Sequence, residues 1–391
     1  MIGDDAPRRY GTYDGLAVRA LDLEARVAEI RELAVEHHSA LAIAEREATF
    51  PKAIYREMGR RGLLGAITPQ EFGGLGGGAA EYCFIQEEVA RHGLVSPQVA
   101  IQGQRWILEW GTPEQVRRYL SGIADGSIIF SESISEKNAG SSFKRMTSTA
   151  RKVGGEWILN GSKTHVNLGA DSDVTAFYAI EETGLTSFLV DMDRPGIRVE
   201  RTDPIGLRLL PTADVHFVDV RVTDDALLGS PGAGLQTFLS VFNLSRLGNA
   251  SELIGFSRRA LTLALDYARQ REVGQNVVTD FQGLQWTASN CYADVYAAGL
   301  ARNRAAMVAD NRLAELGLAT SIAKKLAVDA AERISTEMFG LVGGHGLYHT
   351  APFAAILHDI KVLRVAGGSI EVLRNYIFKK LLGSDDYLGL R

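Results

Sequence analysis

The sequence predicts an α+β protein of several domains, in which a helical part, a β-rich part and a second helical part follow one another. Two observations lead to this fold class. Apolar residues recur at helical spacing towards both ends of the chain, and the middle consists of short runs rich in Val, Ile and Thr. Helices and strands segregated in this way indicate separate layers or domains rather than a doubly wound sheet.

Helical periodicity extends from about Leu21 to Gly122. Apolar residues recur every three or four positions in the runs Leu23–Leu41 and Tyr82–Val89. Pro51 and Pro69 interrupt the pattern, as expected between helices. We therefore expect the N-terminal part to be mostly α-helical.

The residue pattern changes from helical spacing to short strand-like runs between Ser127 and about Gly229. Runs such as EWILNGSKTHV, DVTAFYAI, TSFLVDM and VHFVDVRV are separated by Gly, Asp and Pro, which is typical of strands and turns. Long amphipathic helices are predicted again at Leu235–Arg271, Thr279–Asp310 and Leu316–Phe339.

Composition narrows the classes of function. The 391-residue chain carries a formal charge of -5, and its 42 basic residues are scattered, so we expect no nucleic-acid partner. Cys83 and Cys291 stand in no metal or redox spacing, which predicts no metal site and favours a reducing compartment. The N-terminus has no apolar signal core and no later stretch is long and apolar enough to span a bilayer. We expect a cytoplasmic protein without membrane attachment.

Several motifs occur in an order that is more informative than any one of them. Along the chain they are FPKAIYREMGRRGLLGAITPQEFGGLG, EEVAR at Glu87–Arg91, ISEKNAGSS at Ile134–Ser142, WILNGSK at Trp157–Lys163, YARQREV at Tyr267–Val273, FQ at Phe281–Gln282, GGHG from Gly343, and GSIEVLR at Gly368–Arg374. Together they resemble the successive signatures of the acyl-CoA dehydrogenase superfamily, over nearly the whole chain.

This resemblance implies three domains. They are an N-terminal α-helical domain over residues 1–125, a middle β-barrel or β-sandwich domain over 126–233, and a C-terminal four-helix domain over 234–391. It also implies a noncovalent FAD extended between the last two domains and completed by a neighbouring subunit. A homodimer or homotetramer is therefore expected.

The resemblance also implies residues for the dinucleotide. Arg271 and Gln282 supply donors that suit a pyrophosphate, and in the family they reach the FAD of the partner subunit. Gly343 and Gly344 permit close backbone approach. The remaining expected dinucleotide contacts of the C-terminal part are Ser369 and Glu371.

In the β-rich part, the family's T-E-P-x-A-G-S-D reads S-E-K-N-A-G-S-S. Ile134 and Ser135 are expected at the edge of the flavin ring, and Ser141 at phosphate or thioester. The family's W-[IV]-[TS] is replaced by His165, Val166 and Asn167. Asn167 still offers a hydrogen bond near the flavin, and His165 can donate or accept a proton.

Both positions that hold the catalytic base in the family lack a carboxylate. A gap-free alignment from GGHG onwards puts Gly367 at the usual glutamate, because E-G-T reads G-G-S. In some relatives the base precedes an Arg, and here that residue is Ser245, before Arg246. By resemblance, Asn243, Ser245 and Arg246 contact substrate, together with Ser141.

Three titratable residues are candidate replacements for the base. Glu252 lies seven residues after Ser245 and hence on the same helical face, about 10 Å further along the axis. His165 and His345 are the others, although each also suits a hydrogen-bonding or packing role.

Three functions remain open. The first is an acyl-thioester dehydrogenase, or the reverse reductase, acting on the CH–CH bond of a CoA-bound or carrier-bound acyl group with a non-standard base. The second is a flavin monooxygenase that hydroxylates N, S or C. The third is a catalytically silent FAD-binding subunit. The electron acceptor is expected to be an electron-transfer flavoprotein or O2, and fold alone does not choose among these reactions.

Overall fold

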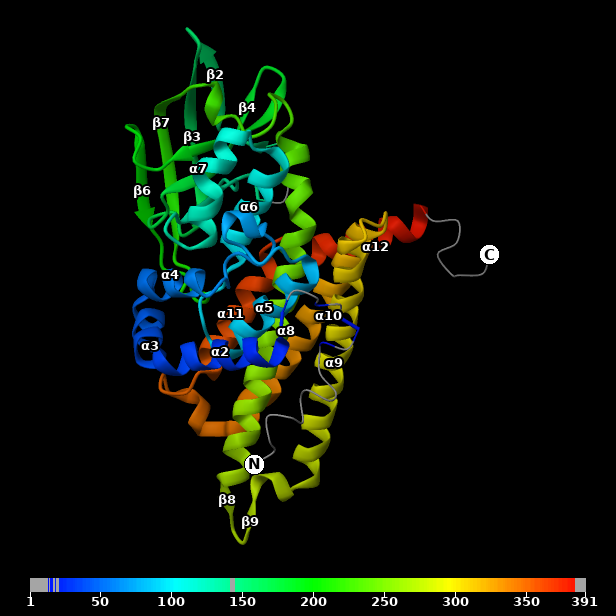
Figure 1. Cartoon of the computed structure of the whole chain (residues 1–391). Coiled ribbons are helices and arrows are strands. Elements are labelled where there is room, and N and C mark those ends of the chain that lie inside the picture. Colours follow the sequence, from blue (N-terminus) through cyan, green and yellow to red (C-terminus); the bar gives the residue numbers. More distant parts are fainter. Residues whose placement is uncertain (1–12, 14, 17, 19–20, 141–144, 384–391) are drawn as a thin grey trace. The chain divides into compact units, whose positions relative to one another are not determined.

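The computed structural model, drawn in Figure 1, describes residues 13, 15, 16, 18, 21–140 and 145–383. It divides into two compact units. The first draws on the described residues up to Ala34, on Ala79–Leu94 and on the chain from Ser245 onwards, and the second consists of Val35–Gly78 and Val95–Leu244. The predicted α+β class, with helices before and after a β-rich middle, is confirmed.

The first unit is helical. Its elements are the larger part of α2 (Leu23–Glu36), α5 (Ala79–His92), α8 (Gly234–Gln270) from Ser245 on, the hairpin β8 (Glu272–Val273) and β9 (Asn276–Val277), η4 (Val278–Asp280), α9 (Gln282–Asp310), α10 (Leu316–Val342), η5 (Gly343–Leu347), α11 (Phe353–Val365) and α12 (Ile370–Gly383).

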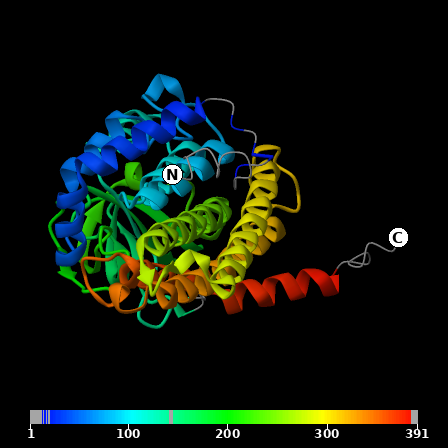
Figure 2. The same cartoon turned by 90° about the horizontal axis from the view of Figure 1, so that it is seen from below.

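Helices α9 and α10 lie side by side, as Figure 2 shows. The connection between them, Asn311–Glu315, is short, and a short connection places consecutive helices antiparallel. One core cluster of this unit brings together small residues of both helices, Ala305 and Ala306 of α9 and Ala323 of α10. Small side chains let the two helix backbones approach closely.

A buried ion network connects three helices of this unit. Glu87 of α5 is fully buried and accepts hydrogen bonds from Arg258 of α8 and from Arg302 of α9, the latter at 2.7 Å. Because each charge in the interior has an opposite charge beside it, these groups are compensated. They serve the packing of α5, α8 and α9.

The second unit places helices around one sheet. Its helices are α3 (His38–Glu47), α4 (Lys52–Arg60), η1 (Gln70–Phe72), α6 (Gln98–Trp110), α7 (Pro113–Ala124), η3 (Asp224–Ala226) and the start of α8. Its strands are β1 (Phe130–Ser133), β2 (Thr149–Val153), β3 (Glu156–Asn167), β4 (Val174–Glu181), β5 (Gly184–Asp191), β6 (Ile197–Arg201) and β7 (Thr212–Val222).

The seven strands form one mixed sheet in the order β1-β4-β2-β3-β7-β6, with β5 also paired to β4. β1 runs parallel to β4, whereas β3 and β7 are antiparallel. Phe177 of β4 and Phe217 of β7 have ring centroids 4.1 Å apart although two strands separate them in the sheet. The sheet therefore curls round its own core into a half-barrel.

The long predicted helices are present with small changes at their ends. The periodic run Leu23–Leu41 is divided, however, because His37 leaves the helical conformation between α2 and α3. The hairpin β8–β9 was not predicted. The three-domain boundaries at 125/126 and 233/234 stay a prediction, and no helix in the described ranges is both long and apolar enough to cross a bilayer.

Candidate active site

The loop between α11 and α12 contains Gly367, where the resemblance predicts that the family's usual glutamate is replaced. Gly367 and Gly368 have φ angles of 65° and 92°, a backbone conformation that favours glycine. Lys324 of α10 is fully buried, and its Nζ donates to the carbonyls of Ala366 and Gly368, the latter at 2.8 Å. The loop is thus held on both sides of Gly367.

The space beside Gly367 is filled by α8. A Cβ at residue 367 would collide with Nδ2 of Asn249 and lie 3.2 Å from Oγ of Ser245. Asn249 Nδ2 donates to the Ala366 carbonyl at 3.1 Å, and Asn249 Oδ1 is buried without a partner among the described residues. An amide therefore lies where a side chain at residue 367 would begin.

Two cations give this loop a positive environment. Burial, reinforced by the charge of Arg246, lowers the pKa of Lys324 to about 7. Arg246 is itself buried, donates to Ser321 Oγ at 3.2 Å, and lies over the Tyr376 ring at 5.6 Å. Positive groups in a site of low polarity stabilise negative charge that develops on a substrate carbonyl.

The other expected dinucleotide residues of this unit lie at helix ends. Ser369 Oγ accepts a 3.5 Å contact from the backbone N–H of Val372 at the start of α12. Glu371 is exposed and accepts from Arg364 at 2.8 Å. These contacts give both residues a local structural role in addition to the expected contact with the dinucleotide.

The GGHG segment follows α10. Gly343 ends the helix with φ 56°, and a Cβ added at Gly343 or Gly344 would meet nothing within 4 Å. The backbone here is open to an approaching ligand. His345 stacks on Tyr267 of α8, with ring centroids 4.7 Å apart and an interplanar angle of 9°.

Glu252 has a partner in the interior. It is 3% exposed, and it accepts a hydrogen bond from Gln86 Nε2 of α5 at 2.9 Å. This contact favours a structural role over that of a base. Of the expected substrate contacts, Asn243 is half-buried in α8 and Ser245 is buried, while Ser141 lies outside the described residues.

In the second unit, an ion pair holds the segment expected at the flavin edge. Lys163 of β3 is fully buried and donates to Glu136 at 2.9 Å and to the Ile134 carbonyl at 3.1 Å. Burial alone would raise the pKa of Glu136, but hydrogen bonds from Ser148, Lys163 and Thr147 outweigh it and lower that pKa to about 2.

Two observations fit the residues to a flavin dinucleotide. The backbone N–H of Thr164 donates to the Ser135 carbonyl at 2.8 Å, and Thr164 Oγ1 is buried with no partner in the described ranges. Arg271 and Gln282 are exposed, and no hydrogen bond or ion pair occupies their side chains within the described part of this chain. A bound polar group would satisfy the buried Thr164 Oγ1. The exposed side chains of Arg271 and Gln282 are accessible to a ligand.

His165 and Asn167 lie at an irregularity of β3. The pairing of β3 with β7 shifts register between Lys163 and Val166, and His165 has φ 58°, which is uncommon for a residue with a side chain. The His165 side chain is exposed, and Asn167 is half-buried opposite Thr212. Such bulges redirect side chains, often beside functional sites.

Glu132 of the second unit is an interior carboxylate that the sequence analysis did not single out. It is half-buried in β1, its Oε1 is buried without a partner in the described chain, and burial raises its pKa to about 8. The available signal was a carboxylate inside a short strand, F-S-E-S, directly before the ISEKNAGSS motif.

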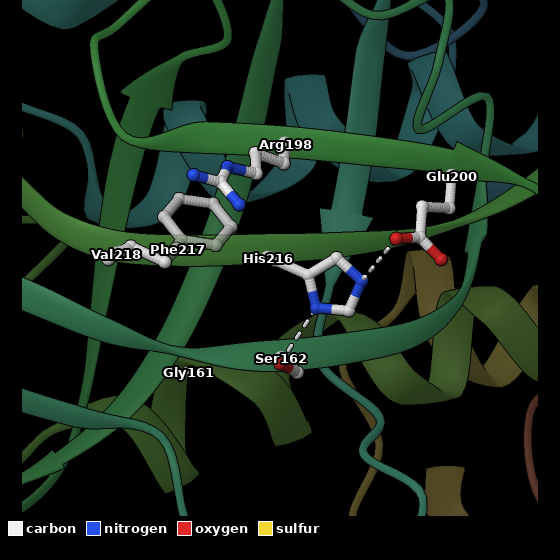
Figure 3. A pocket seen from close by; sticks show the side chains of 7 residues that line it. All are labelled: Gly161, Ser162, Arg198, Glu200, His216, Phe217 and Val218. Atoms are coloured by element: carbon white, nitrogen blue, oxygen red, sulfur yellow. Dashed lines mark hydrogen bonds and ion pairs between the residues drawn. The ribbon is translucent and has the colours of Figure 1, made fainter.

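A further polar cluster lines a pocket on the exposed side of β3, β6 and β7 (Figure 3). Ser162 Oγ lies 2.9 Å from His216 Nδ1, and His216 Nε2 lies 3.9 Å from Glu200 Oε1. The second distance exceeds a hydrogen bond, so Glu200 does not orient the ring as a catalytic acid would. We interpret the cluster as cross-strand polar contacts.

Family models match three successive segments of the chain. They are the N-terminal domain of acyl-CoA dehydrogenase over residues 22–127, its middle domain over 131–220 and its C-terminal domain over 232–382.

Individual relatives agree with this assignment. The mitochondrial short-chain specific acyl-CoA dehydrogenase of Homo sapiens is 30% identical over 88% of this chain and 85% of its own. Acyl-CoA dehydrogenase fadE12 of Mycobacterium tuberculosis is 31% identical over 84% of this chain and 88% of its own. The structure of a glutaryl-CoA dehydrogenase from Mycobacterium smegmatis in complex with FADH2 superposes with a TM-score of 0.88 at 25% identity, covering 94% of this chain and 96% of that one. The chain therefore belongs to the acyl-CoA dehydrogenase family and is an FAD-dependent oxidoreductase of that type.

Proposed function

We propose that the protein oxidises the CH–CH bond of an acyl thioester, bound to CoA or to a carrier protein, with a base outside the two usual positions. The geometry of the Gly367 loop is the observation that carries this proposal. Lys324 donates to the Gly368 carbonyl, Arg246 lies near enough to lower the pKa of Lys324, and Asn249 Nδ2 lies where a side chain on residue 367 would begin.

Different residues of the chain would contact FAD and the substrate. Bound FAD would supply the acceptor for the hydride that leaves the β-carbon. Ile134, Ser135 and Asn167 are proposed to contact its ring, and Gly343, Gly344, Ser369, Glu371, Arg271 and Gln282 its dinucleotide part. Arg246, a cation shielded from water, would stabilise negative charge on the thioester carbonyl, and Lys324 would add to this below its pKa of about 7.

The test is the reductive half-reaction without oxygen. The purified FAD-bound protein is mixed with butyryl-CoA, octanoyl-CoA and the matching acyl-pantetheines, and flavin absorbance is followed. We expect at least one thioester to bleach the flavin, with straight-chain acyl-CoAs slow. If none of the thioesters bleaches the flavin, the dehydrogenase function is excluded. If the protein retains FAD but turns over no substrate, the catalytically silent FAD-binding subunit is the alternative that remains.

A flavin monooxygenase is the second candidate, and the conformation of His165 favours it. His165 is exposed at a bulge with positive φ, which directs a proton-exchanging group out of β3. Product formation that depends on O2 and NAD(P)H, with no reduction by thioesters, would support this reaction. His165→Gln should then lower product yield while FAD retention stays unchanged.

We also propose that the protein is a homo-oligomer and that it passes electrons to an electron-transfer flavoprotein or to O2. Apolar side chains at the start of α9 support the assembly, since Phe281 is 41% exposed and Trp286 is 61% exposed. Light scattering of the FAD-bound protein should give at least a dimer. A stable FAD-bound monomer at low micromolar concentration would exclude it.

A further inference from the structure

The three residues that follow β1 are held against β3, within the second unit. Lys163 of β3 is fully buried, and its Nζ donates to the Ile134 carbonyl at 3.1 Å and to Glu136 Oε1 at 2.9 Å. Beside it, the backbone N–H of Thr164 donates to the Ser135 carbonyl at 2.8 Å. Each of the three consecutive residues therefore has a hydrogen bond to β3.

Glu136 also binds the chain where it returns to the sheet. Its carboxylate accepts hydrogen bonds from the backbone N–H and the Oγ1 of Thr147, both at 2.7 Å, and from the backbone N–H of Ser148 at 3.0 Å. A Cβ on Gly161 of β3 would collide with the Ser148 side chain, so Ser148 packs directly against the β3 backbone. One carboxylate thus joins two stretches of chain that are 11 positions apart.

The ion pair of Lys163 and Glu136 is enclosed by protein. Glu136 is 6% exposed, and the Lys163 ammonium lies over the Phe177 ring of β4, 5.2 Å from its centroid. Well-packed apolar residues of similar volume usually stabilise a fold as well as a buried ion pair does. Charge-assisted hydrogen bonds, in contrast, impose a defined geometry on the groups that they join. The pair is therefore better explained by the conformation that it imposes than by stability alone.

We propose that Lys163 and Glu136 are positioning residues for FAD, which fix the backbone of Ile134 and Ser135 in the conformation that contacts the flavin ring. The inference rests on the proposed contact of Ile134 and Ser135 with that ring. The pair acts through backbone groups, since both charged side chains are buried. Because these backbone groups are already ordered, FAD binding does not have to order them, and the affinity is higher for that reason.

The test replaces the whole pair, so that no charge is left buried alone. Lys163→Met/Glu136→Met has apolar side chains of similar length, and its Tm should stay within about 10 °C of wild type. Hydrogen–deuterium exchange is followed by mass spectrometry on the full-length protein with excess FAD. We expect the amides of Thr147, Ser148 and Thr164 to exchange at least about tenfold faster, because the hydrogen bonds of the segment are lost or loosened. The dissociation constant of FAD, from flavin fluorescence, should rise about 10–100-fold.

Arg221→Met/Glu156→Met is the matched control. It removes another ion pair of β3 in the same unit, but the two side chains are 59% and 44% exposed. An exposed pair contributes little, so exchange at Thr164 and FAD affinity should match wild type. An equal loss of FAD affinity in this control would overturn the specific role of the buried pair.

Thr147→Val is a second, milder variant. It removes one hydroxyl that donates to Glu136 and leaves the ion pair in place, so it should fold even if the double variant does not. We expect faster exchange at Ser148 and a dissociation constant of FAD that is about threefold higher. Wild-type exchange and affinity in Thr147→Val, together with a double variant that does not fold, would show a structural pair and overturn the inference.

The outcomes separate the positioning role from the flavin contact on which it rests. Unchanged exchange at Ser148 and Thr164 in a folded double variant removes the positioning role and leaves the proposed contact standing. Faster exchange with unchanged FAD affinity removes the proposed contact of Ile134 and Ser135 with the ring, and the inference with it. Faster exchange together with weaker FAD binding, in the double variant but not in the control, is the result expected.

Discussion

The side-chain amide of Asn249 lies where a side chain on residue 367 would begin. Asn249 belongs to α8 and Gly367 to the loop after α11, and Asn249 Nδ2 donates to the carbonyl of the preceding residue, Ala366, at 3.1 Å. Room for a carboxylate side chain on residue 367 therefore requires two changes rather than one.

Gly367→Glu alone should destabilise the protein by about 2 kcal/mol or more, because a side chain at φ 65° is strained and its Cβ collides with Asn249. From the sequence alone, the same variant is expected to raise acyl-CoA oxidation if the pocket accepts a thioester. Because the Cβ of residue 367 would collide with Asn249, we expect acyl-CoA oxidation to rise only in the double variant Gly367→Glu/Asn249→Ala. Thermal unfolding and flavin reduction by butyryl-CoA check both statements, and an unchanged Tm in the single variant would contradict the crowding.

Lys324→Met should change how stability depends on pH. The pKa of Lys324 is about 7 in the folded protein against 10.5 for an unperturbed lysine, so the unfolded chain binds more protons between these values. Wild-type stability therefore gains up to about 1.4 kcal/mol per pH unit from this group as pH rises from about 7 to 10.5. The variant should lack that gain in urea unfolding. Its neighbour Lys325, which pairs with Asp329, provides the control Lys325→Met, and equal slopes in the two variants would refute the assignment.

Glu136→Gln should destabilise the β-rich unit by about 3–5 kcal/mol, because it leaves Lys163 buried without its anionic partner. The pKa of Glu136 is lowered to about 2, so its contribution is complete above the ordinary value of 4.5 and is lost as pH falls from there towards 2. Urea unfolding at pH 7 and acid unfolding measure the two effects. Lys152→Met breaks an exposed pair with Asp224 and should cost at most about 1 kcal/mol; a loss as large as that of Glu136→Gln would argue against burial as the cause.

Arg271→Ala should weaken FAD retention about 10–100-fold, the equivalent of one charge-assisted hydrogen bond. Arg271 is exposed and unpaired within the described part of this chain, as expected for a residue that reaches a ligand beyond it. The flavin-to-protein absorbance ratio after dialysis measures the effect. Arg269→Ala is the control, because Arg269 already pairs with Asp266 at 2.8 Å. Equal retention in both variants would remove Arg271 from the dinucleotide site.

The sequence by itself determined the elements and the family. The periodicity of Leu316–Phe339 is local information, and α10 spans Leu316–Val342 as a result. The order of motifs was sufficient to indicate FAD, and it predicts that Gly367 occupies the position of the family's usual glutamate. The break at His37 was missed, since a single residue that leaves the helix does not disturb an apolar repeat.

Only the tertiary structure decided what surrounds those positions. Asn249 fills the space beside Gly367, and Lys324 contacts the same loop, although both are distant from it along the chain. Glu132 is followed in the sequence by charges of both signs, Glu136 and Lys137, yet its Oε1 is buried without a partner among the described residues. Burial and pairing depend on contacts between elements that fold together, and no local pattern of residues records which side chains those contacts satisfy.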